Sequence, residues 1–343
     1  MIKLEKAAVV CFDKTFESSA MFMTDSLLEH TPLIDVELIT RENINNDLSD
    51  YDFFFIWNGV DISVDNYENI LKNLKPHPYN LKCSNCNNEI AEDYEAYRLK
   101  RYPCPLCGAR SSRANNFIYI FAGSHLKNNA DDFFISQLRT RFWSSVDANW
   151  DMFKCLVQSV TIIPHIMIMP QRAWQEPKTP TISHFPTPDE SKSCIALDNV
   201  KKMCNEKGYI YNEDPSKLYK THIYLDQLYS GVPSQYAINA MSIGIPTMVN
   251  LSKFYLSHYP MFPATNITAK TLIQSIDNPS NDMENSEDRI IYVNKWFGPE
   301  KVSKQWYHLA RFILSPDIMF DNYPELDRND LPKYWAYQGG YEI

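Results

Sequence analysis

The chain has 343 residues and a mass of 40.0 kDa, which is more than one hydrophobic core usually serves and favours two domains. Its 44% hydrophobic and 22% charged residues exclude a disordered chain, and no apolar run is long enough to predict a membrane span. The 33 basic and 42 acidic residues give a net charge of -9, which disfavours a uniformly basic protein that coats nucleic acid.

The first half of the chain alternates between short apolar runs and helix-like stretches. Its amino terminus, MIKLEKAAVVCF, has no cleavage-site pattern after a long apolar stretch, so we expect a cytoplasmic protein that begins with a strand. Because short buried strands that alternate with helices form parallel sheets, residues 1–170 are predicted to be an α/β domain. The expected strands are 6–12, 36–40, 51–57, 116–123 and 160–165, and the expected helices are 18–30, 67–74 and 131–143.

A proline-rich segment separates this half from a second one. Residues 170–188 carry five prolines and are predicted to be an interdomain linker that also contains a strand at 181–185. The alternation then resumes, which predicts a second α/β domain at 171–312 and a polar tail at 313–343. Its expected helices are 195–207, 214–221, 235–244 and 300–314, and its expected strands are 208–212, 222–227 and 245–251.

Four of the eight cysteines are tightly grouped. Cys83 and Cys86 form one CxxC pair, and Cys104 and Cys107 form another after a spacer of 17 residues. Four thiolates from two tight turns suit tetrahedral Zn²⁺, and a fully protein-ligated site of this kind is structural. Two disulfides are the alternative, which reduced cytosolic thiols disfavour. We therefore predict a zinc ribbon inserted at about 80–113; the four scattered cysteines are expected to be inert.

The sequence has only nine glycines and contains neither a GxGxxG nor a P-loop pattern. Several weaker motifs follow each other in the second half instead. ISHFPTPDESKS contains His184 and Lys192, and YLDQLYSGVPSQYAINAMSIGIPTMVNL follows it. In this order they resemble retaining GT-B glycosyltransferases. The resemblance implies an α/β GT-B fold, in which two Rossmann-like domains face a cleft, here with a zinc-ribbon insertion in the N-terminal domain.

The resemblance also implies a donor site for a nucleotide-sugar. Sugar transfer builds negative charge on the departing diphosphate, which a lysine and helix N-terminal amides stabilise. The residues expected at the donor are Lys192, Gly231, Ser234, Gln235, Tyr236 and Asn239. For Lys192 a solvated surface lysine is the alternative, and for Ser234 a plain helix cap is. Asp226 and Gln227 either touch the donor or only order the turn that follows them.

Two positions depart from the family pattern. Asn239 stands where the family has a glutamate that holds ribose hydroxyls, and Pro188 and Asp189 occupy a loop where the family has an arginine. An amide oxygen still accepts a hydrogen bond, but more weakly than a carboxylate does. In the first domain, His125 resembles the position of a residue that contacts the transferred sugar, and we expect it and Lys192 to be the catalytic residues; a satisfied structural histidine is the alternative.

The predicted ribbon indicates an acceptor. Residues 72–113 contain eight basic and four acidic residues, with tyrosines between them. Basic and stacking side chains together are typical of nucleic-acid contacts, so we expect DNA carrying a hydroxylated base, or another polymer, as the acceptor. The ribbon alternatively braces the domain or mediates dimerisation. For the whole chain, the alternative function is a non-catalytic binding scaffold with a zinc ribbon and a degenerate GT-B body.

Overall fold

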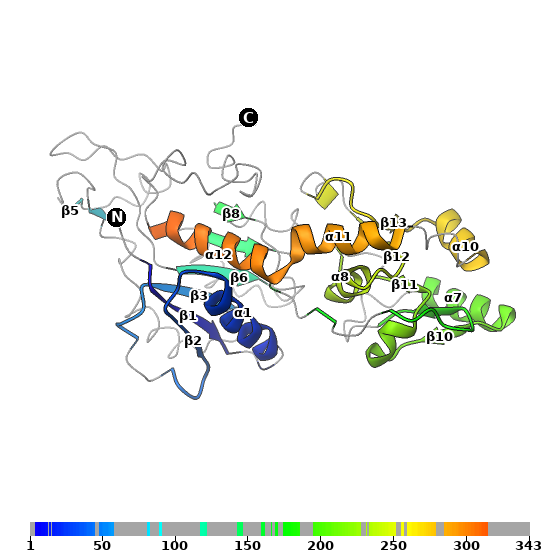
Figure 1. Ribbon diagram of the computed structural model, residues 1–343, viewed down its shortest axis with the longest axis horizontal. Helices are drawn as coiled ribbons and strands as arrows, with labels where there is room; N and C mark the ends of the chain where they lie inside the picture. Colours follow the sequence, from blue (N-terminus) through cyan, green and yellow to red (C-terminus); the bar gives the residue numbers. More distant parts are fainter. Residues whose placement is uncertain are drawn as a thin grey trace. The chain divides into compact units, whose positions relative to one another are not determined.

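The computed structural model divides the chain into two compact units (Figure 1). Unit 1 comprises Met1–Ile166 and Val302–Ile343, and unit 2 comprises Met167–Lys301. The residues that the structure describes are 4–12, 14, 16–44, 48–57, 81–82, 89–90, 117–121, 143–146, 159–161, 166, 169–170, 174–185, 195–227, 231, 233–251, 255–256, 259–278 and 285–314.

Unit 1 contains a six-stranded parallel sheet in the order β2-β1-β3-β6-β7-β8. Strand β1 pairs on both sides, with Val9 opposite Leu38 of one neighbour and Phe55 of the other. A central strand of a parallel sheet is covered on both faces, which explains why this segment is apolar at almost every position. The strands are β1 (Lys6–Cys11), β2 (Asp35–Ile39), β3 (Phe53–Trp57), β6 (Phe117–Phe121), β7 (Trp143–Val146) and β8 (Ser159–Thr161).

Two helices cover one face of this sheet, α1 (Glu17–His30) and α12 (Pro299–Leu314) (Figure 1). Trp306 of α12 is fully buried, and its ring meets that of Phe55 edge-on with centroids 6.0 Å apart. We expected this helix to close the second domain at residue 312. The packing of Trp306 against the first sheet instead assigns α12 from Val302 onward to unit 1.

Strand β7 (Trp143–Val146) also differs from the expectation. We expected a helix at 131–143, whereas Trp143 opens a strand that pairs with β6 on one side and β8 on the other. The segment WSSV carries two serines and therefore lacks the apolar run that marks the other central strands. Hydrogen bonding on both edges of the strand outweighs that local pattern.

Unit 2 contains a five-stranded parallel sheet in the order β10-β9-β11-β12-β13. The helices α7 and α10 share a core with one face of the sheet, and α8 packs against α11. The helix expected at 195–207 is confirmed at both ends. The elements are β9 (Thr181–Ser183), α7 (Ile195–Lys207), β10 (Ile210–Asn212), the 3-10 helix η3 (Pro215–Lys220), β11 (Ile223–Leu225), α8 (Gln235–Ser242), β12 (Thr247–Val249), β13 (Thr265–Asn266), α10 (Ala269–Asp277) and α11 (Ser286–Phe297).

An antiparallel pair of short strands, β4 (Leu81–Lys82) and β5 (Glu89–Ile90), stands apart from the two large sheets. Leu81 pairs with Ile90, and Lys82 pairs with Glu89. The first predicted CxxC pair, Cys83 and Cys86, therefore lies between the two strands in the sequence. Among the described residues, no helix combines the length and the apolar character that a bilayer crossing requires.

Candidate functional site

The carboxyl edge of the unit 2 sheet gathers the polar and aromatic side chains of the candidate site. His184 directly follows β9, and Asp226 directly follows β11, the strand that pairs with β9. The carboxyl ends of parallel strands meet at one edge, where ligands of open α/β sheets bind. Helix α8 follows β11 in the sequence and begins near this edge, since the backbone of its N-cap is bound by Asp226.

A buried carboxylate holds the beginning of α8 in place. Asp226 is fully buried, and its Oδ2 accepts a hydrogen bond from the backbone N–H of Ser234 at 2.8 Å. Ser234 is the N-cap of α8, and its Oγ accepts from the N–H of Ala237 at 3.2 Å. Asp226 thus orders the turn that enters α8, which is one of the two roles that we expected for it. The side-chain cap binds one of the N–H groups of the first turn, and those of Gln235 and Tyr236 donate to no other described residue.

Three aromatic rings line the same edge. Phe185 contacts Tyr224 with ring centroids 5.2 Å apart, and it meets Tyr236 edge-on at 5.0 Å. Burial raises the pKa of Tyr224 well above its ordinary range, the nearby Asp226 raises it further, and a hydrogen bond with the Ser234 side chain opposes both effects. Tyr224 is therefore a neutral phenol. Tyr236 keeps 38% of its surface exposed, which leaves one ring of the group accessible to a ligand.

The imidazole of His184 bridges the ends of two strands. Its Nδ1 lies 2.9 Å from the carbonyl oxygen of Leu225, and its own backbone N–H donates to the carbonyl of Asn212 at 3.0 Å. Only 3% of the residue is exposed. Burial lowers the pKa of His184, and the hydrogen bond to Leu225 offsets only part of that effect. The ring is therefore neutral near pH 7.

Two further expected residues occupy defined positions around α8. Gly231 has φ of +71°, in the left-handed region that favours glycine, and forms an isolated bridge with Leu251 beyond the end of β12. Asn239 lies one turn after Gln235 on α8. Its Oδ1 is buried and has no hydrogen-bond partner among the described residues. Such an acceptor is costly unless a donor reaches it, as a ligand hydroxyl would.

The far end of α8 is fixed by α11. Gly244 follows the C-cap Ile243 with φ of +89°, and its carbonyl oxygen accepts from Nε of the buried Arg289 at 3.1 Å. A Cβ added at Gly244 would lie 2.0 Å from Ser286 Oγ. The orientation of α8, and with it the position of Ser234, thus depends on close backbone approach at its C-terminal end.

The remaining expected site residues lie outside the described part of the chain. These are His125, Lys192, Cys83, Cys86, Cys104 and Cys107. No group of His, Cys, Asp and Glu side chains that could hold a metal occurs among the residues that the structure does describe. Of the scattered cysteines, Cys11 and Cys204 are buried thiols, and burial raises the pKa of Cys204 to about 11. An unreactive thiol is what we expected at both.

Sequence reasoning missed the aromatic and imidazole groups of the site. Phe185 and Tyr224 belong to apolar runs that read as strand, so nothing marked them as site residues. His184 served only as a reference position for Lys192. Its place one residue after a strand, opposite the similar position of Asp226, is the signal that could have identified it.

No protein-family model matches the sequence, and no curated protein sequence does. Solved structures match over nearly the whole chain. Sucrose-phosphate synthase from Thermosynechococcus elongatus has a TM-score of 0.54 and 8% identity, and covers 91% of this chain and 100% of its own. AviGT4, a glycosyltransferase involved in avilamycin A biosynthesis, has a TM-score of 0.51 and 10% identity, and covers 91% of this chain and 98% of its own. At such low identity the likeness concerns the fold, and the chain has the GT-B-like fold of two parallel α/β units.

Proposed function

We propose that the protein is a retaining glycosyltransferase that moves a hexosyl or pentosyl group from a nucleotide-sugar to an acceptor hydroxyl. The observation that carries the proposal is the seating of α8 at the carboxyl edge of unit 2, where Asp226 and Ser234 fix its first turn. Helix N-terminal N–H groups bind phosphate, and this edge is where ligands of such sheets are found. The fold shared with two solved structures over 91% of the chain supports the same reading.

The donor is held by groups of different chemistry. The diphosphate binds the first turn of α8 and the ammonium group of Lys192, which compensates the negative charge of the leaving group. Asn239 offers an amide oxygen to a hydroxyl of the nucleotide, and Tyr236 offers an exposed ring. The full proposed set is Lys192, Gly231, Ser234, Gln235, Tyr236 and Asn239.

The chemical step needs no strong general base. The bond between the anomeric carbon and the donor phosphate oxygen breaks, and a bond from the acceptor oxygen to the same carbon forms on the same face. The acceptor proton passes to the leaving phosphate oxygen, so the products are the glycosylated acceptor and a nucleoside diphosphate. Lys192 stabilises the leaving group, and His125 contacts the transferred sugar.

The cysteine cluster holds a structural Zn²⁺ and presents the acceptor-binding surface. Cys83, Cys86, Cys104 and Cys107 are the proposed ligands, and the antiparallel pair β4–β5 brackets the first two in the sequence, as the turn of a zinc knuckle requires. The basic and tyrosine-rich stretch around the cluster recruits a polymeric acceptor, for which DNA is the first candidate.

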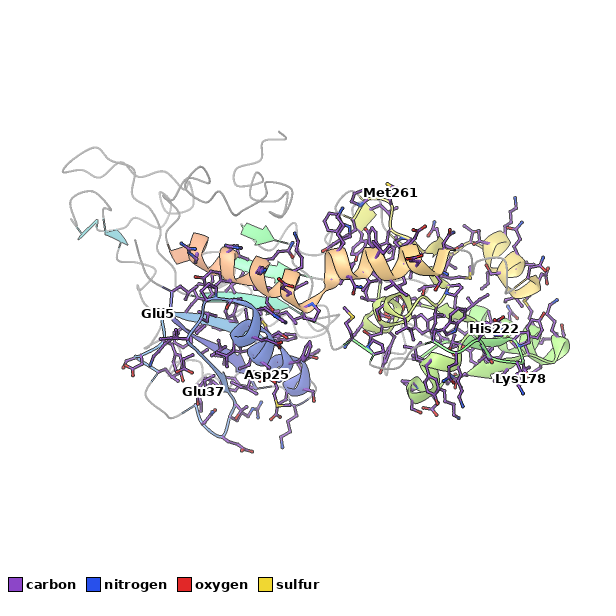
Figure 2. The ribbon with its side chains drawn as sticks, in the orientation of Figure 1. Glu5, Asp25, Glu37, Lys178, His222 and Met261 are labelled. Atoms are coloured by element: carbon purple, nitrogen blue, oxygen red, sulfur yellow. The ribbon has the colours of Figure 1, made fainter. Side chains whose placement is uncertain are left out.

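The test is a thermal-shift panel of UDP, ADP and GDP with their hexose conjugates. Binding to the native state alone raises the unfolding free energy by about 2.7 kcal/mol at a ligand concentration of 100 times Kd. We expect stabilisation by one nucleotide and its conjugate, lost in Lys192→Ala. Lys178→Ala is the matched control, because Lys178 is an exposed lysine of unit 2 that precedes β9 (Figure 2). A flat response of the unmodified protein across the panel would refute the proposal and favour a scaffold.

A further inference from the structure

The hydrogen bond of His184 determines its tautomer. A carbonyl oxygen can only accept, so Nδ1 must carry the proton that it shares with Leu225 across 2.9 Å. Because the ring is neutral, Nε2 then carries a lone pair. Among the residues that the structure describes, the imidazole makes one hydrogen bond, the one from Nδ1.

This arrangement leaves a lone pair on a residue of which only 3% is exposed. His184 also stands at the carboxyl edge of the sheet, where ligands of open α/β sheets bind. A neutral imidazole nitrogen that carries a lone pair can only accept, so at this edge it suits a ligand group that donates a hydrogen bond.

We infer that Nε2 of His184 accepts a hydrogen bond from a ring hydroxyl of the bound nucleotide-sugar and thereby selects for that hydroxyl. The inference rests on the proposed function and adds a specificity-determining residue to it. The hydroxyl belongs either to the glycosyl group or to the ribose, and both sources present the same chemistry to the imidazole. A phosphate is a poor partner, because its oxygens are acceptors as well.

His222 provides a matched control with the opposite tautomer. Its Nδ1 accepts from the backbone N–H of Thr181 at 3.2 Å, so its proton resides on Nε2. The residue is also buried, but it precedes β11 and binds the first residue of β9, which places it at the amino edge of the same sheet (Figure 2). A substitution there perturbs unit 2 without touching the proposed ligand site.

The experiment separates the two nitrogen atoms of His184. In His184→Asn the amide nitrogen replaces Nδ1 as the donor to Leu225, and nothing replaces Nε2. In His184→Gln the longer side chain returns an acceptor oxygen to the position of Nε2. Dissociation constants are measured by calorimetry for UDP, 2′-deoxy-UDP and UDP-glucose, or for the corresponding adenine or guanine set if that base binds in the panel.

We expect His184→Asn to weaken UDP-glucose binding roughly 3- to 10-fold, the range for one neutral hydrogen bond, and His184→Gln to restore most of it. If the hydroxyl is glycosyl, UDP binding is unchanged in His184→Asn. If it is the ribose 2′-hydroxyl, UDP and UDP-glucose weaken equally, and 2′-deoxy-UDP becomes insensitive to the substitution. His222→Asn should lower the melting temperature and leave all three constants unchanged.

The inference is overturned if His184→Asn binds all three ligands as the unmodified protein does, or if His184→Gln is as defective as His184→Asn. Either result leaves the proposed function intact, because the unmodified protein still binds the donor. Failure of the unmodified protein to bind any nucleotide or conjugate overturns the proposed function itself.

Discussion

Replacing Gly244 by alanine tests whether the close approach of α11 to the C-terminal end of α8 holds α8 in position. Two costs add at this position. The backbone has φ of +89°, and the left-handed region costs a non-glycine residue about 1–2 kcal/mol. The new Cβ would lie 2.0 Å from Ser286 Oγ; even after that hydroxyl rotates, Ser286 Cβ at 3.3 Å and Ile290 Cδ1 at 3.4 Å remain. We assign about 1 kcal/mol to this residual crowding.

Gly208 isolates the first cost. It has φ of +70°, and an added Cβ meets nothing within 4 Å, so Gly208→Ala should cost about 1–2 kcal/mol. Gly244→Ala should cost about 2–3 kcal/mol. In a double-mutant cycle with Ser286→Gly, which removes both Ser286 atoms, about 1 kcal/mol should return as coupling.

The assay must report on unit 2, because a chain of two units need not unfold in one step. Cys204 is a buried thiol of α7, and Cys11 is a buried thiol of β1 in unit 1. Pulsed alkylation in increasing urea, quantified for the two cysteine-containing peptides, therefore gives one unfolding midpoint for each unit. We expect Gly208→Ala to lower the Cys204 midpoint and Gly244→Ala to lower it further, with the Cys11 midpoint unchanged in both.

The reasoning would be refuted if Gly244→Ala lowered the Cys204 midpoint no more than Gly208→Ala does, or if Ser286→Gly gave no recovery. The melting temperature shift caused by the donor nucleotide should also shrink in Gly244→Ala, since the first turn of α8 is displaced with its last.

Three further predictions concern the ribbon and the buried histidines. Elemental analysis should find one zinc per chain and a reduced content in Cys86→Ser; full occupancy in that variant would contradict the proposed ligand set. DNA binding should weaken steeply with added salt and be lost when Arg98, Lys100 and Arg101 are replaced by alanine, whereas salt-independent binding would exclude a phosphate contact. His184 and His222 have lowered pKa values in the folded chain, so below about pH 6.5 the unfolded chain binds protons that the folded chain does not. The contribution of the two neutral imidazoles to the free energy of unfolding is complete above that pH and is lost as the pH falls. The Cys204 midpoint should therefore drop between pH 7.5 and 5.5, and replacing both histidines by asparagine should make this drop smaller.

The role of Asp226 follows from the contact that the structure adds. From the sequence, a donor contact and an ordering role in the turn were equally acceptable. The bond from the N–H of Ser234 to Oδ2 supports the ordering role, because it ties the buried carboxylate to the N-cap of α8. The same bond places a negative group beside the N-terminus of α8, which makes Lys192 more important for any diphosphate that binds there.

The sequence by itself determined the elements whose information is local. The apolar run Phe53–Trp57 and the helix Ile195–Lys207 follow from the apolar character of a doubly covered strand and from helical periodicity, and the cap at Ser234 follows from a serine before a helical pattern. The order of the weak motifs was sufficient to predict the two-unit fold.

Tertiary structure alone decided the features that depend on partners distant in sequence. Trp143–Val146 becomes a strand because two neighbours offer hydrogen bonds on both sides, and α12 joins unit 1 because Trp306 finds its apolar contact on Phe55, some 250 residues away in the sequence. The tautomer of His184 is set by a carbonyl of the neighbouring strand. Helix periodicity and capping depend on residues within a turn of each other, whereas strand pairing, helix docking and the protonation of a buried ring depend on what the fold brings beside them.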